Sequence, residues 1–225
     1  MFNWLKPGWP DAARLIAQRR TLMHVSSSYP LTGRCLNAGC GEGLYCPFLE
    51  QFAVTEIVNV DLANTSGMLA RFKDPRHRTL DASLVSLPLD DGSFDSCLCT
   101  EVIEHIQDDN KAVNELARCL RSGGRLLLSV PHPPAPFDSN HVREGYTLPS
   151  MTSLLERNGF DVVASGRCFG LWMDWFIRIW RWQHQTLGKG RRNYMPMLLV
   201  WAFGYLDQFL PLGHKWDLVV MAVKK

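Results

Sequence analysis

Three alternating glycines give this chain a turn that could hold a charged or nucleotide-like ligand. Gly39, Gly41 and Gly43 follow an apolar run and precede residues compatible with a helix. Glycine adopts positive φ readily, and its missing Cβ lets a ligand approach the backbone. A helix that starts beyond the turn presents unpaired N–H groups, which favour a carboxylate or a phosphate. The segment therefore predicts a strand, a tight turn and a helix start, the nucleotide-binding corner of an α/β sheet.

An acidic residue follows the glycines at a spacing that suits ribose recognition. Asp61 comes directly after the apolar run 57–60, about 20 residues beyond the glycines. A carboxylate at this strand tip can accept hydrogen bonds from ribose hydroxyls. The glycines depart from the G-x-G-x-x-G pattern of dinucleotide folds, because Gly43 comes one residue early.

Three histidines near predicted strand ends are candidate general bases. His105 follows the fourth strand, His132 follows the fifth, and His141 lies in the loop before the next helix. Ligands of open α/β sheets bind at this edge, where a histidine can take a proton from a hydroxyl acceptor. Each histidine also has a structural alternative: a backbone hydrogen bond, packing, or ordering of its loop. No residues have the spacing of a zinc site, so the sequence predicts no metal.

Hydrophobic periodicity predicts that strands and helices alternate along the chain. The predicted strands are 33–38, 54–60, 77–80, 94–100, 125–130, 160–164 and 217–223. The predicted helices are 11–20, 43–52, 64–72, 108–120 and 148–158. Ser122, Gly123 and Gly124 are expected to end the helix over 108–120. This alternation favours an α/β fold, with a parallel sheet and helices on both faces.

Five motifs in this order resemble those of class I S-adenosylmethionine-dependent methyltransferases. They are 36–43, Asp61, 80–82, 94–106 and 121–131, and the resemblance covers about 33–166. The similarity is to the small-molecule, quinone-biosynthesis-like branch, of methyltransferase type 11. It implies a Rossmann-like, seven-stranded, mostly parallel sheet whose last strand is antiparallel. It also implies S-adenosyl-L-methionine as the cofactor.

The resemblance assigns ten cofactor-binding positions in this sequence. They are Asn37, Gly39, Cys40, Gly41, Asp61, Leu62, Asp81, Ala82, Thr100 and Glu101. Asp81 would meet the adenine amino group, while Thr100 and Glu101 would line the cleft near the methionine end. The family usually has Asp or Glu at position 37, where Asn37 can accept a hydrogen bond but supplies no charge.

A tryptophan-rich insertion over 167–215 separates the last two predicted strands. It holds most of the eight tryptophans, and its first half carries six basic residues against one acid. Its apolar segment 197–210 is shorter than the roughly 20 residues that span a bilayer. Two interpretations stay open and are compatible. The insertion is a lid or a homodimer face, or it contacts a membrane peripherally.

Composition favours a single globular domain over 1–225, which the resemblance implies is a methyltransferase domain. We divide it into a helical cap (1–30), a cofactor-binding core (31–166), the insertion (167–215) and the final strand (216–225). The net charge of +2 gives no reason to expect a nucleic-acid partner. No signal peptide is recognised, and seven scattered cysteines are expected to be reduced core residues. We therefore expect a cytoplasmic protein, peripheral to the inner face of a membrane where the insertion contacts lipid.

The sequence leaves the acceptor open. The first reading is methyl transfer to a small or lipid-like acceptor. The alternatives are an RNA or protein methyltransferase, with the insertion as its docking surface, and a catalytically silent cofactor-binding subunit of an assembly. Asn37 favours the silent-subunit interpretation, whereas Asp61 and Asp81 argue against it.

Overall fold

A seven-stranded sheet forms the centre of the computed structural model, which describes all residues except 1–9, 63–66, 68–72, 137–139, 188–196 and 211. The strands are β1 (Thr32–Ala38), β2 (Ala53–Asp61), β3 (His77–Asp81), β4 (Phe94–Thr100), β5 (Leu120–Pro131), β6 (Phe160–Cys168) and β7 (Asp217–Lys224). Their order is β3-β2-β1-β4-β5-β7-β6. β7 runs antiparallel to β5 and β6, and the strands from β3 to β5 are parallel. The predicted Rossmann-like sheet with an antiparallel last strand is confirmed.

Each face of the sheet has its own hydrophobic core, because successive strand residues point to opposite faces. Leu36 packs on the side of α4 (Asp109–Cys119) and α5 (Leu148–Arg157). Its neighbour Cys35 packs on the side of α1 (Pro10–Val25) and α2 (Cys46–Leu49). All seven cysteines are buried and form no disulfide, as the sequence predicts.

Several element boundaries differ from the predicted ones. The helix predicted over 43–52 is only the single turn of α2 (Cys46–Leu49). α4 ends at Cys119, before the predicted Ser122–Gly124 stop, because Leu120 already pairs with Phe94 of β4. The helix predicted over 64–72 lies outside the described residues, apart from position 67.

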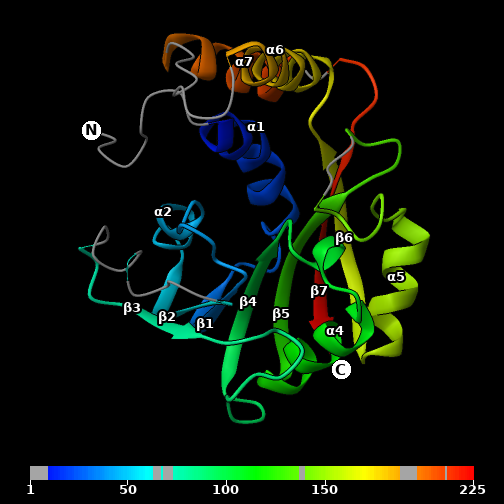
Figure 1. Ribbon diagram of the computed structural model, residues 1–225. Helices are drawn as coiled ribbons and strands as arrows, with labels where there is room; N and C mark the ends of the chain where they lie inside the picture. Colours follow the sequence, from blue (N-terminus) through cyan, green and yellow to red (C-terminus); the bar gives the residue numbers. More distant parts are fainter. Residues whose placement is uncertain (1–9, 63–66, 68–72, 137–139, 188–196, 211) are drawn as a thin grey trace.

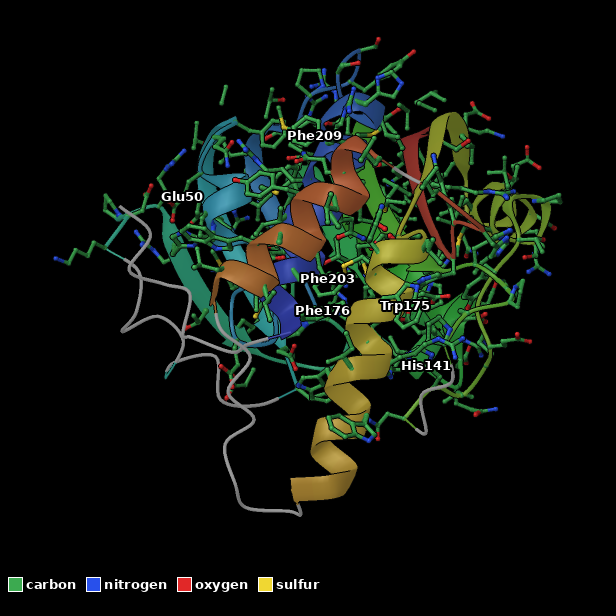
Figure 2. The ribbon with its side chains drawn as sticks, turned by 90° about the horizontal axis from the view of Figure 1, so that it is seen from above. Glu50, His141, Trp175, Phe176, Phe203 and Phe209 are labelled. Atoms are coloured by element: carbon green, nitrogen blue, oxygen red, sulfur yellow. The ribbon has the colours of Figure 1, made fainter. Side chains whose placement is uncertain are left out.

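The insertion forms two helices that lie together across one end of the molecule, beside α1 (Figure 1). They are α6 (Leu171–Leu187) and α7 (Met197–Phe209). The buried Asp207 of α7 accepts hydrogen bonds from the backbone N–H groups of Gly170 and Met173, which lie at the start of α6. Phe176 and Phe203 pack between the two helices with ring centroids 5.8 Å apart (Figure 2). No helix in the described ranges is long and apolar enough to cross a membrane.

Candidate cofactor site and active site

The glycine turn after β1 is held against the end of β2 by backbone hydrogen bonds. The N–H groups of Gly39 and Cys40 both donate to the carbonyl of Val60, at 2.8 and 2.9 Å. The Gly41 N–H donates to Oδ2 of Asp61 at 2.7 Å. Gly39 and Gly41 have φ values of 70° and 51°, in the region that side chains with a Cβ rarely adopt. The sequence therefore forms the tight turn that the glycine spacing predicts.

Two hollows meet at this turn. The first, of about 340 Å³, is lined by Gly39, Gly41, Asp61, Leu62, Ala82, Ser83, Leu84, Glu101, Val102, His105 and Ile106. The second, of about 330 Å³, is lined by Arg14, Gly39, Cys40, Gly41, Glu42, Leu44, Tyr45, Thr100 and Glu101. Because Gly39, Gly41 and Glu101 line both, the hollows are two parts of one cleft at the carboxyl ends of β1, β2 and β4.

Eight of the ten predicted cofactor residues line this cleft; Asn37 and Asp81 do not. The buried Asn37 side chain turns toward β2, where its Nδ2 donates to Oδ1 of Asn59 at 2.8 Å. Asp81 is exposed at the end of β3, in register with Asp61. The predicted contacts of Asn37 with the methionine end and of Asp81 with adenine stay predictions.

The first hollow offers an acceptor for ribose hydroxyls and apolar surface for a purine ring. Both oxygens of Asp61 accept backbone hydrogen bonds, Oδ2 from Gly41 and Oδ1 from Leu62 at 2.8 Å. A carboxylate offers about four acceptor sites, so Asp61 retains capacity for two ribose hydroxyls. A Cβ placed on Gly41 would meet no described atom within 4 Å, so the turn leaves room for a ligand. Leu62, Ala82 and Leu84 supply apolar surface for a purine ring.

The second hollow carries charges that match the zwitterionic end of an amino acid. Arg14 of α1 and Glu101, which follows β4, line it from opposite elements, with 3.6 Å between Nη2 and Oε2. Glu101 Oε1 accepts a hydrogen bond from Ser129 Oγ at 2.9 Å, and its backbone has φ of 55°. Strained backbone of this kind concentrates at functional sites. The residues present therefore fit S-adenosylmethionine: adenosine in the first hollow and its methionine end in the second.

Arg14 and Tyr45 are cleft residues that sequence reasoning missed. Tyr45 is buried and donates its hydroxyl hydrogen to Oε1 of Gln18. Gln18 in turn donates to Asp217 Oδ2 at 2.7 Å, which ties α1 to the start of β7. No local pattern marks Arg14 as a ligand, since its position in the cleft depends on how α1 packs on the sheet.

Two buried carboxyls lie behind the cleft. Desolvation, with Glu101 nearby, raises the pKa of Asp217 well above its ordinary value. The same two causes raise the pKa of Glu104 to about 9. Glu104 lies in a 3-10 turn (Ile103–His105), and its side chain is fully buried.

The three candidate bases lie in different surroundings. His105 lines the first hollow, and its ring packs edge-on against His141 with centroids 4.6 Å apart. His132 lies apart from both hollows; its Nδ1 is 3.0 Å from the Tyr146 carbonyl and its ring stacks on His214. His214 lines a third hollow of about 420 Å³, between the loop after β5 and α6. Only His105 therefore borders the glycine-turn cleft directly.

Part of the chain is similar to known methyltransferases. The family model described as "Methyltransferase domain" matches residues 36–128, from β1 into β5. A protein of Mycobacterium tuberculosis, described as a probable S-adenosylmethionine-dependent methyltransferase, is 36% identical over 143 residues. These cover 60% of this chain and 52% of that protein. The ubiquinone biosynthesis O-methyltransferase of Xylella fastidiosa is 30% identical over 137 residues, or 57% of this chain and 54% of that protein. The chain thus spans about half the length of these relatives.

Solved structures share the fold at low sequence identity. The 1,6-didemethyltoxoflavin-N1-methyltransferase of Burkholderia thailandensis, solved with S-adenosylhomocysteine, has a TM-score of 0.61 and 18% identity. The match covers 92% of this chain and 78% of that one. The [4+2]-cyclase SpnF has a TM-score of 0.64 and 16% identity, covering 94% of this chain and 80% of that one. Since a cyclase also has this fold, the fold by itself does not specify methyl transfer. Residues 36–128 are therefore similar to the methyltransferase domain of S-adenosylmethionine-dependent methyltransferases, and the seven-stranded sheet is the fold that the solved structures share.

Proposed function

We propose that this chain transfers the methyl group of S-adenosylmethionine to a small, amphiphilic or lipid-like acceptor. The bound cofactor supplies a methyl group that its sulfonium charge activates for in-line displacement. Asp61 would hold the ribose, and Arg14 and Glu101 would hold the charged methionine end. The protein contributes positioning, which accounts for a large part of such a rate enhancement.

The exposed apolar side chains of α6 and α7 are the main reason to propose a lipid-like acceptor. Large exposed hydrophobic side chains of the described residues concentrate there: Leu171, Trp175, Trp182, Leu198, Leu199, Trp201, Tyr205, Phe209, Leu210 and Leu212. Leu198 is 76% exposed and Trp182 is 64% exposed. A concentration of exposed apolar side chains of this kind is typical of a binding or membrane-contact site.

The charges around this surface favour a lipid surface as its partner. Among the described exposed positions of α6 and α7, the charged one is the cation Arg178. Arg20 of α1 lies over the Phe209 ring, 5.6 Å from its centroid. Asp207 is buried between the helices. Aromatic side chains beside cations suit the headgroup region of an anionic bilayer.

The third hollow offers a place for the acceptor below this surface. Its lining combines apolar and charged side chains: Pro134, Ala135, Pro136, Asp174, Ile177, Arg178, His214 and Trp216. Arg178 belongs both to this hollow and to the exposed side of α6. An amphiphile drawn from a lipid surface would meet such a mixed lining. The Xylella fastidiosa relative, named for ubiquinone biosynthesis, also supports a small-molecule acceptor.

A transfer experiment tests the proposal. Methyl-labelled S-adenosylmethionine is incubated with the protein and a whole-cell extract of the source organism, and the products are separated into organic-soluble, aqueous, protein and nucleic-acid fractions. We expect label in the organic fraction, lost in Asp61→Asn. The matched control is Asp161→Asn, because Asp161 pairs with Lys225 on the surface of β6. Label in protein or nucleic acid would overturn the acceptor class, and no label in any fraction would favour the silent-subunit alternative.

The lipid contact is tested separately by vesicle flotation. The double variant Trp201→Ser with Tyr205→Ser removes two exposed aromatic rings from α7. We expect the wild-type protein to float with vesicles containing an anionic phospholipid and the variant to remain unbound. Val163→Ser on β6 is the control, since Val163 is an exposed apolar residue outside the insertion. Equal flotation of all three proteins would refute the contact, and self-association measured by light scattering would assign the surface to a second copy of the chain.

A further inference from the structure

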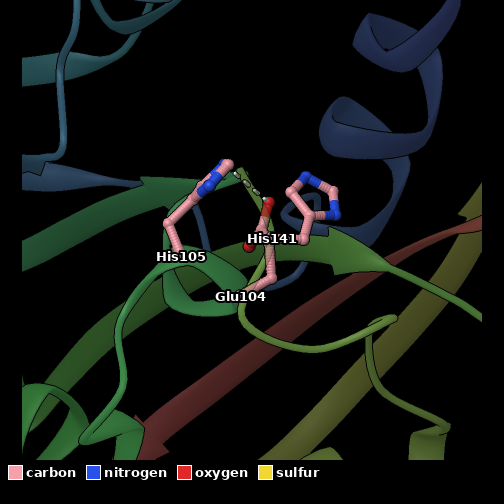
Figure 3. A group of neighbouring side chains, drawn as sticks. All are labelled: Glu104, His105 and His141. Atoms are coloured by element: carbon pink, nitrogen blue, oxygen red, sulfur yellow. Dashed lines mark ion pairs between the residues drawn. The ribbon is translucent and has the colours of Figure 1, made fainter. Parts of the chain in front are cut away.

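A carboxylate and two histidines meet beside the cofactor cleft. Glu104 and His105 belong to the 3-10 turn after β4, and His141 belongs to the loop after β5 (Figure 3). One ligand atom of each side chain can be chosen so that all three lie within 4.8 Å of one another. The two segments are joined by a hydrogen bond from the Val142 N–H to the Glu104 carbonyl, at 3.0 Å. The turn after β4 and the loop after β5 therefore both contribute side chains to the cluster, and a hydrogen bond holds them together.

The hydrogen bond of His105 selects one tautomer of its neutral ring. Its Nδ1 lies 3.0 Å from the backbone carbonyl of Asn140. Since a carbonyl only accepts, Nδ1 carries the hydrogen and Nε2 of the neutral ring has a lone pair. This Nε2 lies 3.7 Å from Oε1 of Glu104. Metal-binding histidines show the same arrangement, in which the outer nitrogen donates to a carbonyl and the inner one binds the ion.

The unpartnered carboxyl group of Glu104 is a further reason to expect an ion here. Its side chain is fully buried, and neither oxygen has a hydrogen-bond partner among the described residues. The nearby Arg143 does not satisfy it, because its guanidinium donates to the carbonyls of Ile103, Ile106 and Gln107. A buried carboxylate without a partner is costly unless a proton or a cation neutralises it. The 3.7 Å gap between Oε1 and His105 Nε2 is where that cation would lie.

We propose that Glu104, His105 and His141 bind a divalent transition-metal ion. Two imidazole nitrogens with one carboxylate suit zinc, iron or nickel better than magnesium or calcium, which prefer oxygen ligands. Ligand bonds of about 2.0–2.1 Å in a tetrahedral site hold neighbouring ligand atoms roughly 3.4 Å apart, close to the observed gap. Three protein ligands leave one position open, as in catalytic zinc sites.

The open position gives the ion a use in methyl transfer. His105 lines the first hollow, so the ion lies at the edge of the cofactor cleft. A hydroxyl or phenol oxygen of an acceptor is a suitable fourth ligand, because a bound cation lowers the pKa of such a group. This use rests on the proposed function, whereas binding of the ion does not. The site departs from the sequence prediction that no metal is bound.

Zinc titration of the full chain tests the site. After dialysis against a chelator, Zn²⁺ binding is measured by calorimetry for the wild-type protein, Glu104→Gln, His105→Ala and His141→Ala. We expect one ion per chain, with affinity at least about tenfold weaker in each variant. His24→Ala is the matched control, because His24 is an exposed histidine at the end of α1. It should bind zinc like the wild-type protein.

X-ray absorption of the zinc-loaded protein gives a readout that does not depend on activity. We expect two nitrogen ligands and at least one oxygen ligand at about 2.0–2.2 Å. Circular dichroism of each variant separates loss of the site from loss of the fold. Absence of binding, or equal affinity in folded variants, would overturn the site. Glu104 Oε1 and His105 Nε2 would then share a proton instead of an ion. Zinc binding without organic-phase label would keep the site and refute the proposed function.

Discussion

A single methyl group at Gly41 should separate cofactor binding from stability. Gly41 has φ of 51°, lines both hollows, and an added Cβ would meet no described atom within 4 Å. Gly159, at the end of α5, has φ of 80°, and an added Cβ there would also meet nothing within 4 Å. The two glycines are thus matched in backbone strain and in free space. They differ in that only Gly41 faces the cleft.

The strain gives the size of the expected stability change. A residue with a Cβ pays about 1–2 kcal/mol in the left-handed region. For a chain of this size, each kcal/mol lowers the melting temperature by about 2–4 °C. Gly41→Ala and Gly159→Ala should therefore both melt about 2–8 °C below the wild-type protein. The Gly41 methyl group would in addition occupy space that the cofactor needs, which should weaken binding by at least about tenfold, or 1.4 kcal/mol.

Calorimetric titration with S-adenosylhomocysteine measures the difference. The titration is run at a temperature where thermal melts show all three proteins to be folded. We expect Gly159→Ala to bind like the wild-type protein and Gly41→Ala to bind at least about tenfold more weakly. If Gly41→Ala and Gly159→Ala bind with equal affinity, the glycine turn does not contact the cofactor and the proposed orientation is wrong.

Three further predictions concern stability. The neutral form of the buried Asp217 is favoured in the folded state, because burial raises its pKa. Wild-type stability should therefore fall as pH rises above about 3.9, the pKa of Asp in the unfolded chain. The melting temperature of Asp217→Asn minus that of the wild-type protein should be larger at pH 8 than at pH 5. An equal difference at both pH values would refute a buried neutral carboxyl. Arg76 lowers the pKa of Asp74 to about 2, so Asp74→Asn should cost about 1 kcal/mol at pH 7. That cost should disappear as pH falls from about 4 toward 2, and denaturant titrations that show the same cost at both ends would contradict it. Phe176→Ala should cost about 3–5 kcal/mol, because its fully buried ring packs against Phe203; a loss below about 1 kcal/mol in a urea titration would show that α6 is not packed on the core.

The sheet could be predicted from sequence because its signals are local. Apolar runs ending in glycine or an acid define β1 and β2, and a proline, Pro131, is the last residue of β5. The start of β5 could not be predicted in this way. Their sequence predicts that residues 121–124 end a helix. In the structure they belong to β5, because Leu120 pairs with Phe94 of β4. Strand pairing is a long-range property, so it overrides the local turn signal.

The cleft was predictable in outline, because ligands of α/β sheets bind at the carboxyl ends of the strands. The side chains that depend on long-range packing were not. Asn37 turns toward Asn59 of the neighbouring strand, and Arg14 reaches the cleft only because α1 packs across the sheet. The buried Glu104 contacts the loop around His141 through the Val142 N–H, although that loop lies well beyond it in sequence. No local pattern could report that contact.

A crystal structure with S-adenosylhomocysteine would test the central claim most directly. The account predicts that both ribose hydroxyls lie within about 3 Å of the Asp61 carboxylate. Adenine should contact Leu62, Ala82 and Leu84, and the homocysteine end should lie between Arg14 and Glu101. Ligand bound in the hollow beside His214, or a ribose that does not touch Asp61, would contradict the assignment of the cleft as the cofactor site.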